Sequence, residues 1–436
     1  MVSRVQRVSC GAAFVSDPRV SEKIIEGRIT PVEGSYSEAA EDPVFLRAQN
    51  IAEGHLDFSD AKRLLPEVFS QDKDSILADG DIVLTIDGVR LGKAAVHRAG
   101  DEVCCISNHM VRILCGTDLT ADYLSWFLNS PAGQQQILRG TTGSAIPGIR
   151  TDAIGRICVP LPAPAEQREL VDAMESALDA QRTKLAEADA LLAGMDAYLL
   201  DVLKLESPTP LRKVYAVKAH QLSDDLSAER YAALQLERTL PWAGSVADAV
   251  RLIDTRTIPS QVGPDEEWDW IRIDEIPNRP WQVDAVRTEL GSAIEGPMYQ
   301  VRENDILLAR LGPTILNAKF VLAPKPQRQT VASPEFLVLR CKQGWEPEVV
   351  LWLLRMKLFR DIMYLRSRGG TPSRYRLDGN DLLSISFPVA ADLPQQSIAT
   401  EIRRRRERAR ALRAEAEQGW AEAKRWFEEQ LLASAD

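Results

Sequence analysis

The 436-residue sequence has few of the side chains from which metal and nucleophilic centres are built. Its four histidines are scattered, and none is paired in sequence with a nucleophile. None of its six cysteines forms a C-x-x-C pair or stands at zinc-finger spacing from a histidine. We therefore expect reduced thiols that pack as small apolar side chains, and no metal site.

Long apolar runs are also absent. No stretch approaches the ~18 to 20 apolar residues that span a bilayer, and residues 1–14 lack the apolar core of an export signal. We expect a cytoplasmic protein with no membrane contact. The net charge of -10 argues against a protein that coats nucleic acid through overall positive charge, but it allows DNA binding by local basic loops.

What the sequence does contain is an internal repeat with a period of about 225 residues. Each copy shows β-type runs, an amphipathic helix, a glycine-rich loop, a strand that ends in proline and one long helix. The matched blocks are residues 45–51 with 270–276, 81–88 with 305–312, 123–128 with 349–354, and 157–160 with 385–388. We therefore predict two copies of one domain-plus-helix unit.

The two long helices carry apolar side chains in steps of three and four, as in a coiled coil. In the first helix these include Val171, Met174, Leu178, Leu185, Leu192, Met195 and Leu199, and in the second Ile398, Ile402, Leu412, Gly419 and Trp426. Residues 166–201 carry nine acidic and three basic side chains, whereas residues 395–430 carry seven acidic and nine basic ones. This contrast favours pairing of the two helices. The alternative is that the arginine run 403–406 is a solvated face or contacts DNA.

These patterns predict an α+β fold made of two tandem α/β domains, each followed by a long helix. The domains are assigned to residues 1–164 and 208–392, and the helices to residues 165–207 and 393–436. We expect the helices, each roughly 54 Å long, to form an antiparallel intramolecular coiled coil with pseudo-two-fold symmetry. Such a chain could read two unlike DNA half-sites, as dimers read half-sites about 34 Å apart.

Short motifs recur in the same order in both copies: residues 79–84, 140–144, 157–162 and 165–167 in the first copy, 304–308, 369–373 and 385–388 in the second, and 226–231 at the start of the second domain. This order of motifs resembles the type I restriction–modification specificity (S) subunit. The resemblance covers about residues 45–432. The sequence departs from the family pattern in two places. At the proline-to-helix junction of the second half, Gln395 stands where the first half has Glu166, and residues 1–42 match the pattern poorly.

The resemblance implies a subunit without a catalytic centre, in which two target-recognition domains choose a bipartite, asymmetric sequence in double-stranded DNA. It also implies that the long helices dock two methyltransferase subunits, and that restriction and translocase subunits join the complete phage-defence complex. S-adenosylmethionine, ATP and magnesium are then expected on these partners, and this chain is expected to bind no cofactor itself.

Two glycine-containing loops are the best candidates for contact with DNA, because arginine binds phosphates and guanine edges while hydroxyl groups bind phosphates. Both loops contain no acidic residue. Loop 366–376 offers Arg366, Arg368, Thr371, Ser373, Arg374 and Arg376, loop 139–150 offers Arg139, Thr141, Thr142, Ser144 and Arg150, and Arg90, Lys93 and Arg310 are lesser candidates. The alternative is that the loops only cap the preceding helix or contact the long helices.

Three other functions compete with this interpretation. A self-contained methyltransferase would need a D/N-P-P-F/Y motif, but residues 42–45 read Asp-Pro-Val-Phe and no glycine-rich cofactor loop precedes them. For a nuclease, the sequence offers only residues 60–62 and 422–424, which match the end of a metal-dependent nuclease motif but are tripeptides of a common kind. An S-like adaptor that guides another defence effector to DNA would have the same sequence features, and neighbouring genes would distinguish it.

Overall fold

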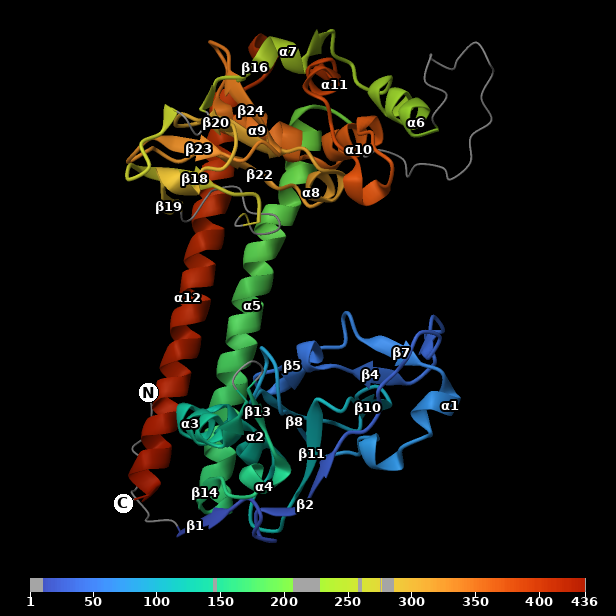
Figure 1. Cartoon of the computed structure of the whole chain (residues 1–436), viewed down its shortest axis with the longest axis vertical. Helices are drawn as coiled ribbons and strands as arrows, with labels where there is room; N and C mark the ends of the chain where they lie inside the picture. The colour runs from blue at the N-terminus through green and yellow to red at the C-terminus, as the bar shows by residue number, and fades with distance from the viewer. Residues whose placement is uncertain are drawn as a thin grey trace. The chain divides into compact units, whose positions relative to one another are not determined.

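The computed structural model describes residues 11–143, 147–206, 228–257, 261–274, 276 and 286–435. The chain forms two compact units, Met1–Ala186 with Leu412–Asp436 (unit 1) and Glu187–Ala411 (unit 2). The long helices α5 (Pro164–Val202) and α12 (Gln395–Ala435) each contribute a segment to both units (Figure 1). Among the described helices, none is long and apolar enough to cross a membrane.

Unit 1 is built on an antiparallel sheet in the order β2-β11-β8-β9 and a second sheet in the order β10-β4-β7-β3. The strand pair β1-β14 joins the beginning and the end of the domain. The strands are β1 (Gly11–Phe14), β2 (Ser21–Glu26), β3 (Tyr36–Ser37), β4 (Val44–Leu46), β5 (Ile51–Ala52), β6 (His55–Leu56), β7 (Lys62–Leu64), β8 (Ile82–Thr85), β9 (Ala94–Val96), β10 (Cys104–Ile106), β11 (Met110–Cys115), β12 (Thr141–Thr142), β13 (Gly148–Ile149) and β14 (Cys158–Leu161). The helices before α5 are α1 (Pro66–Phe69), α2 (Ala121–Asn129), α3 (Pro131–Arg139) and α4 (Thr151–Ile154).

Unit 2 repeats this plan with sheets in the orders β16-β24-β21-β22 and β17-β20-β23-β18-β19, and with the closing pair β15-β25. The strands are β15 (Gly244–Ser245), β16 (Val250–Leu252), β17 (Arg256–Thr257), β18 (Glu267–Ile271), β19 (Arg287–Leu290), β20 (Met298–Gln300), β21 (Ile306–Ala309), β22 (Phe320–Leu322), β23 (Thr330–Ala332), β24 (Phe336–Cys341) and β25 (Ser386–Phe387). The helices before α12 are α6 (Ala228–Glu237), α7 (Val246–Ala249), α8 (Gly312–Leu316), α9 (Pro347–Arg355), α10 (Lys357–Arg366) and α11 (Gly379–Leu383).

A buried aspartate marks the same turn in both domains. Asp81 accepts a hydrogen bond from the Ala78 amide, and Asp305 accepts one from the Arg302 amide. The residue before each aspartate has a left-handed backbone, with φ of 83° at Gly80 and 65° at Asn304. In addition, each second sheet contains one parallel strand pair, β10-β4 in unit 1 and β23-β18 in unit 2. The predicted α+β fold with a repeated domain-plus-helix unit is confirmed.

A glutamine in the first turn of each long helix fastens that helix to its domain. Gln167 accepts a hydrogen bond from the Thr120 amide and donates to the Asp118 and Pro162 carbonyls. Gln395 accepts from the Glu346 amide and donates to the Gly344 and Ala390 carbonyls. The structural counterpart of Gln395 is therefore Gln167, and the pairing of Gln395 with Glu166 from sequence is wrong by one residue.

In unit 1, the beginning of α5 packs against the end of α12. Val171, Met174 and Leu178 share one buried core with Trp420, Phe427 and Leu431. The domain completes this core through α2, because the Tyr123 ring lies 6.4 Å from the Phe427 ring and the Trp126 ring lies 5.8 Å from the Trp420 ring. Helix α12 is therefore part of the core of the first domain, although it lies at the other end of the chain.

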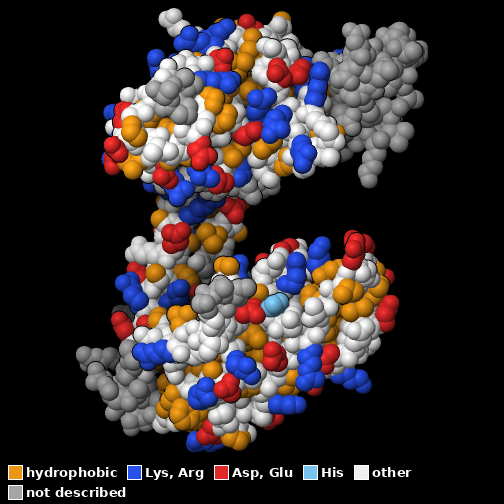
Figure 2. All heavy atoms as spheres, viewed as in Figure 1, with side chains coloured by type: hydrophobic (Ala, Val, Ile, Leu, Met, Phe, Trp, Pro, Cys, Tyr) orange, Lys and Arg blue, Asp and Glu red, His pale blue; other side chains and the backbone are white. Residues whose placement is uncertain are grey.

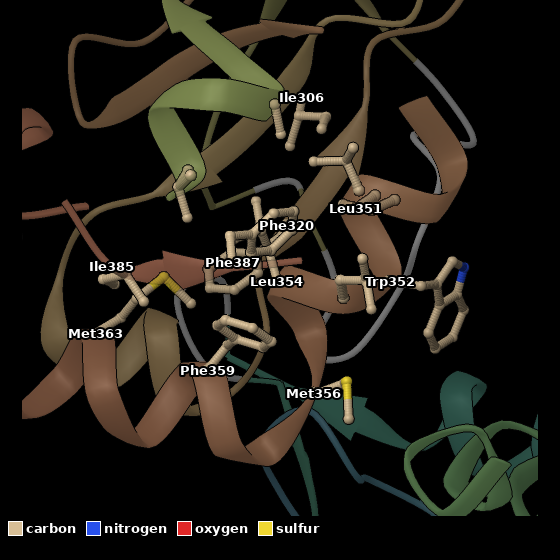
Figure 3. Packing of buried hydrophobic residues seen from close by; sticks show 14 of the residues in the cluster. Ile306, Phe320, Leu351, Trp352, Leu354, Met356, Phe359, Met363, Ile385 and Phe387 are labelled. Atoms are coloured by element: carbon tan, nitrogen blue, oxygen red, sulfur yellow. The ribbon is translucent and has the colours of Figure 1, made fainter. Parts of the chain in front are cut away.

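In unit 2, the end of α5 packs against the beginning of α12. Met195 and Leu199 share a core with Ile398 and Ile402, and Leu192 packs against its edge. In the same core, the Phe359 ring contacts the Phe387 ring edge-on at 5.3 Å (Figure 3). In both units the helix directions are therefore opposed, which confirms the predicted antiparallel pairing.

One predicted coiled-coil position, Leu185, is wrong, and a second, Trp426, packs only at the edge of the core. Leu185 is 37% exposed, whereas the nearest buried apolar residues of α5 on either side are Leu178 and Ala188. Trp426 is only partly buried, and the central aromatic side chain is Phe427. The stripe on α12 runs from Leu412 through Ala416 and Trp420 to Phe427 and Leu431, one residue beyond the predicted Gly419 and Trp426.

The arginine run of α12 holds the second domain as well as the partner helix. Arg403 and Arg406 both pair with the carboxylate of Glu348, which is 7% exposed at the beginning of α9. Between the helices, ion pairs join Lys184 to Glu415 in unit 1 and Arg408 to Glu187 in unit 2. The expectation that opposite charges mainly join helix to helix is thus only partly correct, and the run is not simply a solvated face.

These contacts predict unequal effects of truncating two adjacent aromatic residues. Phe427→Ala removes a fully buried ring and should lower the free energy of unfolding of unit 1 by about 3–5 kcal/mol. Trp426→Ala, the matched control, should cost clearly less because its side chain is already partly solvated. Denaturant titration of the two variants measures the difference, and a larger effect at position 426 would contradict the observed helix register.

Candidate nucleic-acid interface

Loop 366–376 of unit 2 is a short hairpin that follows α10. Its arms meet at the backbone pair Arg368 and Arg376. It is anchored beside β21, where the Gly312 amide donates to the Tyr375 carbonyl at 2.8 Å and the Leu377 amide donates to the Arg310 carbonyl at 2.9 Å. A Cβ atom at Gly369 would lie 2.5 Å from the Arg374 carbonyl oxygen, so this tight hairpin requires glycine there.

Arg366 does not belong to the candidate DNA surface. Its side chain is 10% exposed, and its Nε donates to Glu237 Oε1 at 2.6 Å. Its Nη1 donates to the Asp381 carbonyl and to the Ser384 hydroxyl, both at 2.7 Å. The prediction for this residue is corrected: Arg366 is a structural arginine that joins α10 to α6 and α11.

The other three arginines of the loop are exposed. Arg368 lies 4.0 Å from Asp381, and Arg376 pairs with Glu335 at 2.9 Å. The hydrogen bonds from Arg376 to Glu335 raise the pKa of the guanidinium. Thr371 and Ser373 are also exposed, with their hydroxyl groups 3.2 Å apart. The structure therefore gathers three cations and two hydroxyl groups on one solvent-facing hairpin.

Arg310 lies directly beside this hairpin, as its amide donates to the carbonyl of Glu335, the residue that pairs with Arg376. Its Nε is buried and has no hydrogen-bond partner among the residues that the structure describes. The sequence singled out Arg310 separately from the loop, and the fold brings the two together. We call Arg310, Arg368, Thr371, Ser373, Arg374 and Arg376 the second loop surface.

The corresponding loop of unit 1 is the hairpin β12-β13, which follows α3. Its Ile149 amide donates to the Ile86 carbonyl at 2.9 Å, so the hairpin lies beside the end of β8 and the turn after it. Arg139, Thr142 and Arg150 are exposed, whereas the Thr141 hydroxyl is used to cap α3 by donating to the Leu138 carbonyl. The predicted Ser144 lies outside the described residues.

Lys93 has a structural partner, which corrects its assignment as a DNA contact. Its Nζ lies 2.5 Å from Glu53 Oε1, and Glu53 Oε2 lies 3.3 Å from both Trp420 Nε1 and Lys424 Nζ. Burial alone would raise the pKa of Glu53, but the ion pairs with Lys93 and Lys424 outweigh it and lower that pKa. Lys93 thus fastens the turn after β8 to α12. Arg90 is exposed, and it donates weakly to the Ile51 carbonyl at 3.4 Å.

Features that would favour an enzyme have structural roles here. The His97 ring is bonded to the Ala78 and Glu102 carbonyls, and His109 pairs with Asp87. Burial raises the pKa of the Cys105 thiol to about 12, which removes it as a nucleophile. Residues 44–45 of the Asp-Pro-Val-Phe segment are buried in β4. Within the described ranges, no group of three histidine, cysteine or acidic side chains is placed to hold a metal.

The visible face of each unit carries basic and acidic side chains intermixed, without a continuous field of one sign (Figure 2). This agrees with the net charge of -10. Attraction to DNA by overall charge is therefore weak, and binding would depend on local groups such as the second loop surface.

The sequence did not indicate the structural roles of Gln167, Glu53 and Phe427, and it marked Gln395 only as a departure from the motif. The two glutamines could have been found, because they occupy equivalent places in the repeat. Glu53 has no local sequence signal, since its partners Lys93 and Lys424 come from distant segments.

The two kinds of arginine in loop 366–376 should respond differently to mutation. Arg366→Ala leaves the Glu237 carboxylate, whose side chain is only 12% exposed, without its cation, and it should destabilise unit 2 by about 3–5 kcal/mol. Arg374→Ala, the control, should change the stability by no more than about 0.5 kcal/mol, because its side chain is solvated. Equal effects on denaturant unfolding would show that Arg366 is not a structural residue.

Neither the family models nor the curated proteins give a match to this sequence. Among solved structures, a chain from a study of complex assembly and conformational transition of the type I R-M system matches 98% of this chain and 97% of its own length, with a TM-score of 0.52 and 14% identity. The HsdS subunit from Thermoanaerobacter tengcongensis matches 98% of this chain and 97% of its own length, with a TM-score of 0.36 and 15% identity. The S subunit from M. genitalium matches 99% of this chain and 98% of its own length, with a TM-score of 0.43 and 9% identity. The first match extends over nearly the whole of both chains. The chain therefore shares its fold with this chain of a type I R-M system, which agrees with the fold expected from the resemblance.

Proposed function

We propose that this chain is the DNA-specificity subunit of a type I restriction–modification complex and carries no catalytic centre. The observation that carries the proposal is the duplicated domain, with a solvent-facing loop at the same place in each copy, within a fold shared over 98% of the chain with a component of a type I R-M system. The structural environments of His97, Cys105 and the buried segment Val44–Phe45 support the assignment of catalysis to partner subunits.

The two loop surfaces have different chemistry, which supports an asymmetric target. The second loop surface presents four arginines, two hydroxyl groups and a paired acid, Glu335. The loop of unit 1 presents Arg139, Thr142 and Arg150, together with the turn that carries Arg90. Arginine pairs well with the guanine O6 and N7 acceptors, whereas threonine and backbone amides suit phosphates. Two unlike surfaces on one chain would select two unlike half-sites.

Methyl transfer and cleavage are assigned to partner subunits. Methyltransferase subunits would dock on exposed positions of the long helices, and Leu185 is one apolar side chain of α5 that is exposed. S-adenosylmethionine would be held by those subunits, and ATP and magnesium by the restriction and translocase subunits. The chain itself contributes binding and position.

Expression of the chain alone should leave DNA unmodified, because the proposed chemistry requires a methyltransferase partner. Coexpression with that partner should produce adenine methylation at one bipartite sequence. Long-read methylation mapping of both strains provides the measurement. Modification by the chain alone would contradict the proposal, as would a partner whose target sequence is unaffected by this chain.

The second loop surface should account for part of the salt dependence of DNA binding. In the complex with the methyltransferase, Arg368→Ala with Arg374→Ala should lower the slope of log affinity against log salt by about two, because each phosphate contact contributes about one. The matched control is Arg19→Ala with Arg238→Ala, which removes the same charge from exposed positions outside both loops and both long helices. A slope that does not change in the loop variant would remove this hairpin from the interface.

A further inference from the structure

An apolar side chain stands at the tip of the turn after β8. Val89 is fully exposed, whereas the residues that carry the turn are fixed. The Leu91 amide donates to the Gly88 carbonyl at 3.1 Å, and the Gly92 amide donates to the Thr85 carbonyl at 2.9 Å. Gly88 and Gly92 have φ of 73° and 83°, a left-handed conformation that a side chain at either position would strain.

The buried Thr85 side chain holds this turn from below. Its hydroxyl group accepts a hydrogen bond from the Lys93 amide at 3.0 Å and donates to the Arg90 carbonyl. Lys93 is in turn held by Glu53. The turn is thus fixed on both sides of Val89, so little conformational entropy remains to be lost when its tip contacts a ligand.

Val89 lies among the candidate DNA-binding groups of unit 1. Arg90 is its neighbour in the turn, and the hairpin β12-β13 is bonded to Ile86 and Asp87 just before it. The Gln134 side chain donates to the Gly92 carbonyl at 2.7 Å, which places α3 against the turn. Leu138, one helical turn after Gln134, is 61% exposed and lies next to Arg139. Apolar and cationic side chains therefore occur together on this surface.

We infer that Val89 contacts the C5-methyl group of a thymine in the half-site read by unit 1. This rests on the proposed function and specifies one of its contacts. Thymine is the base that presents a methyl group in the major groove, and apolar side chains recognise it there. A single exposed valine is common on protein surfaces. Here it is distinguished by a rigid turn, full exposure and the exposed cation of the adjacent Arg90.

The corresponding turn of unit 2 has a different structure. Residues 81–88 align with residues 305–312, so the counterpart of Val89 is Pro313, which lies in the first turn of α8. There the hairpin of the second loop surface covers the turn through the bond from Gly312 to Tyr375. The thymine contact is therefore expected in one half-site only.

The test uses the full chain in complex with its methyltransferase and duplexes that carry its mapped target. Each thymine of the half-site read by unit 1 is replaced in turn by deoxyuridine, which lacks only the methyl group. The unmodified complex should lose about fourfold in affinity at one thymine, as expected for one buried methyl group. Val89→Ala should bind the normal target about fourfold more weakly and show no further loss with deoxyuridine at that position.

Val103→Ala is the matched control, because Val103 is an exposed valine of the same unit in the loop before β10. It should retain both the affinity and the sensitivity to deoxyuridine. The inference is overturned if Val89→Ala behaves like this control, or if it weakens assembly with the methyltransferase and leaves the deoxyuridine effect intact. Failure of the unmodified complex to prefer any sequence would instead contradict the proposed function itself.

Discussion

The structure depends on burial of the apolar stripes of α5 and α12 in cores that neither helix could form alone. In unit 1, Met174 and Phe427 come from sequence positions far apart, and Trp126 of the domain completes their cluster. In unit 2, Met195 and Ile402 play the same part with α9 and α10. Because the hydrophobic contribution scales with the area removed from water, each domain owes part of its stability to both helices, and the helices become a fixed support for the loops.

The features that the two halves of the chain share are structural, whereas the features that differ between the halves face solvent. The turns at Asp81 and Asp305 and the glutamines Gln167 and Gln395 have equivalent hydrogen bonds in both halves. The loops beside β8 and β21 differ in charge and shape. This division would allow the loops to change by substitution without loss of the fold, as the proposed function requires.

The sequence was sufficient to predict the repeat, the fold class and the antiparallel pairing. Apolar periodicity can be read within one segment, and the repeat can be read by comparing the two halves of the chain. It was insufficient for Trp426, since heptad spacing alone cannot distinguish a position from its neighbour when Trp420, Trp426 and Phe427 all offer large apolar surfaces. It also misassigned Arg366 and Lys93. Their partners, Glu237 and Glu53, come from other segments and become visible only when tertiary contacts form.

The most direct test of this account is hydrogen exchange on a chain truncated after Ala411, which removes the segment of α12 that belongs to unit 1. The account predicts that amides of β8, β11 and α2 lose protection, because Trp420, Phe427 and Leu431 no longer cover their core. Amides of β21, β24 and α9 should remain protected, since unit 2 is intact. Loss of protection in unit 2 with unit 1 unchanged would contradict the antiparallel pairing on which the account depends.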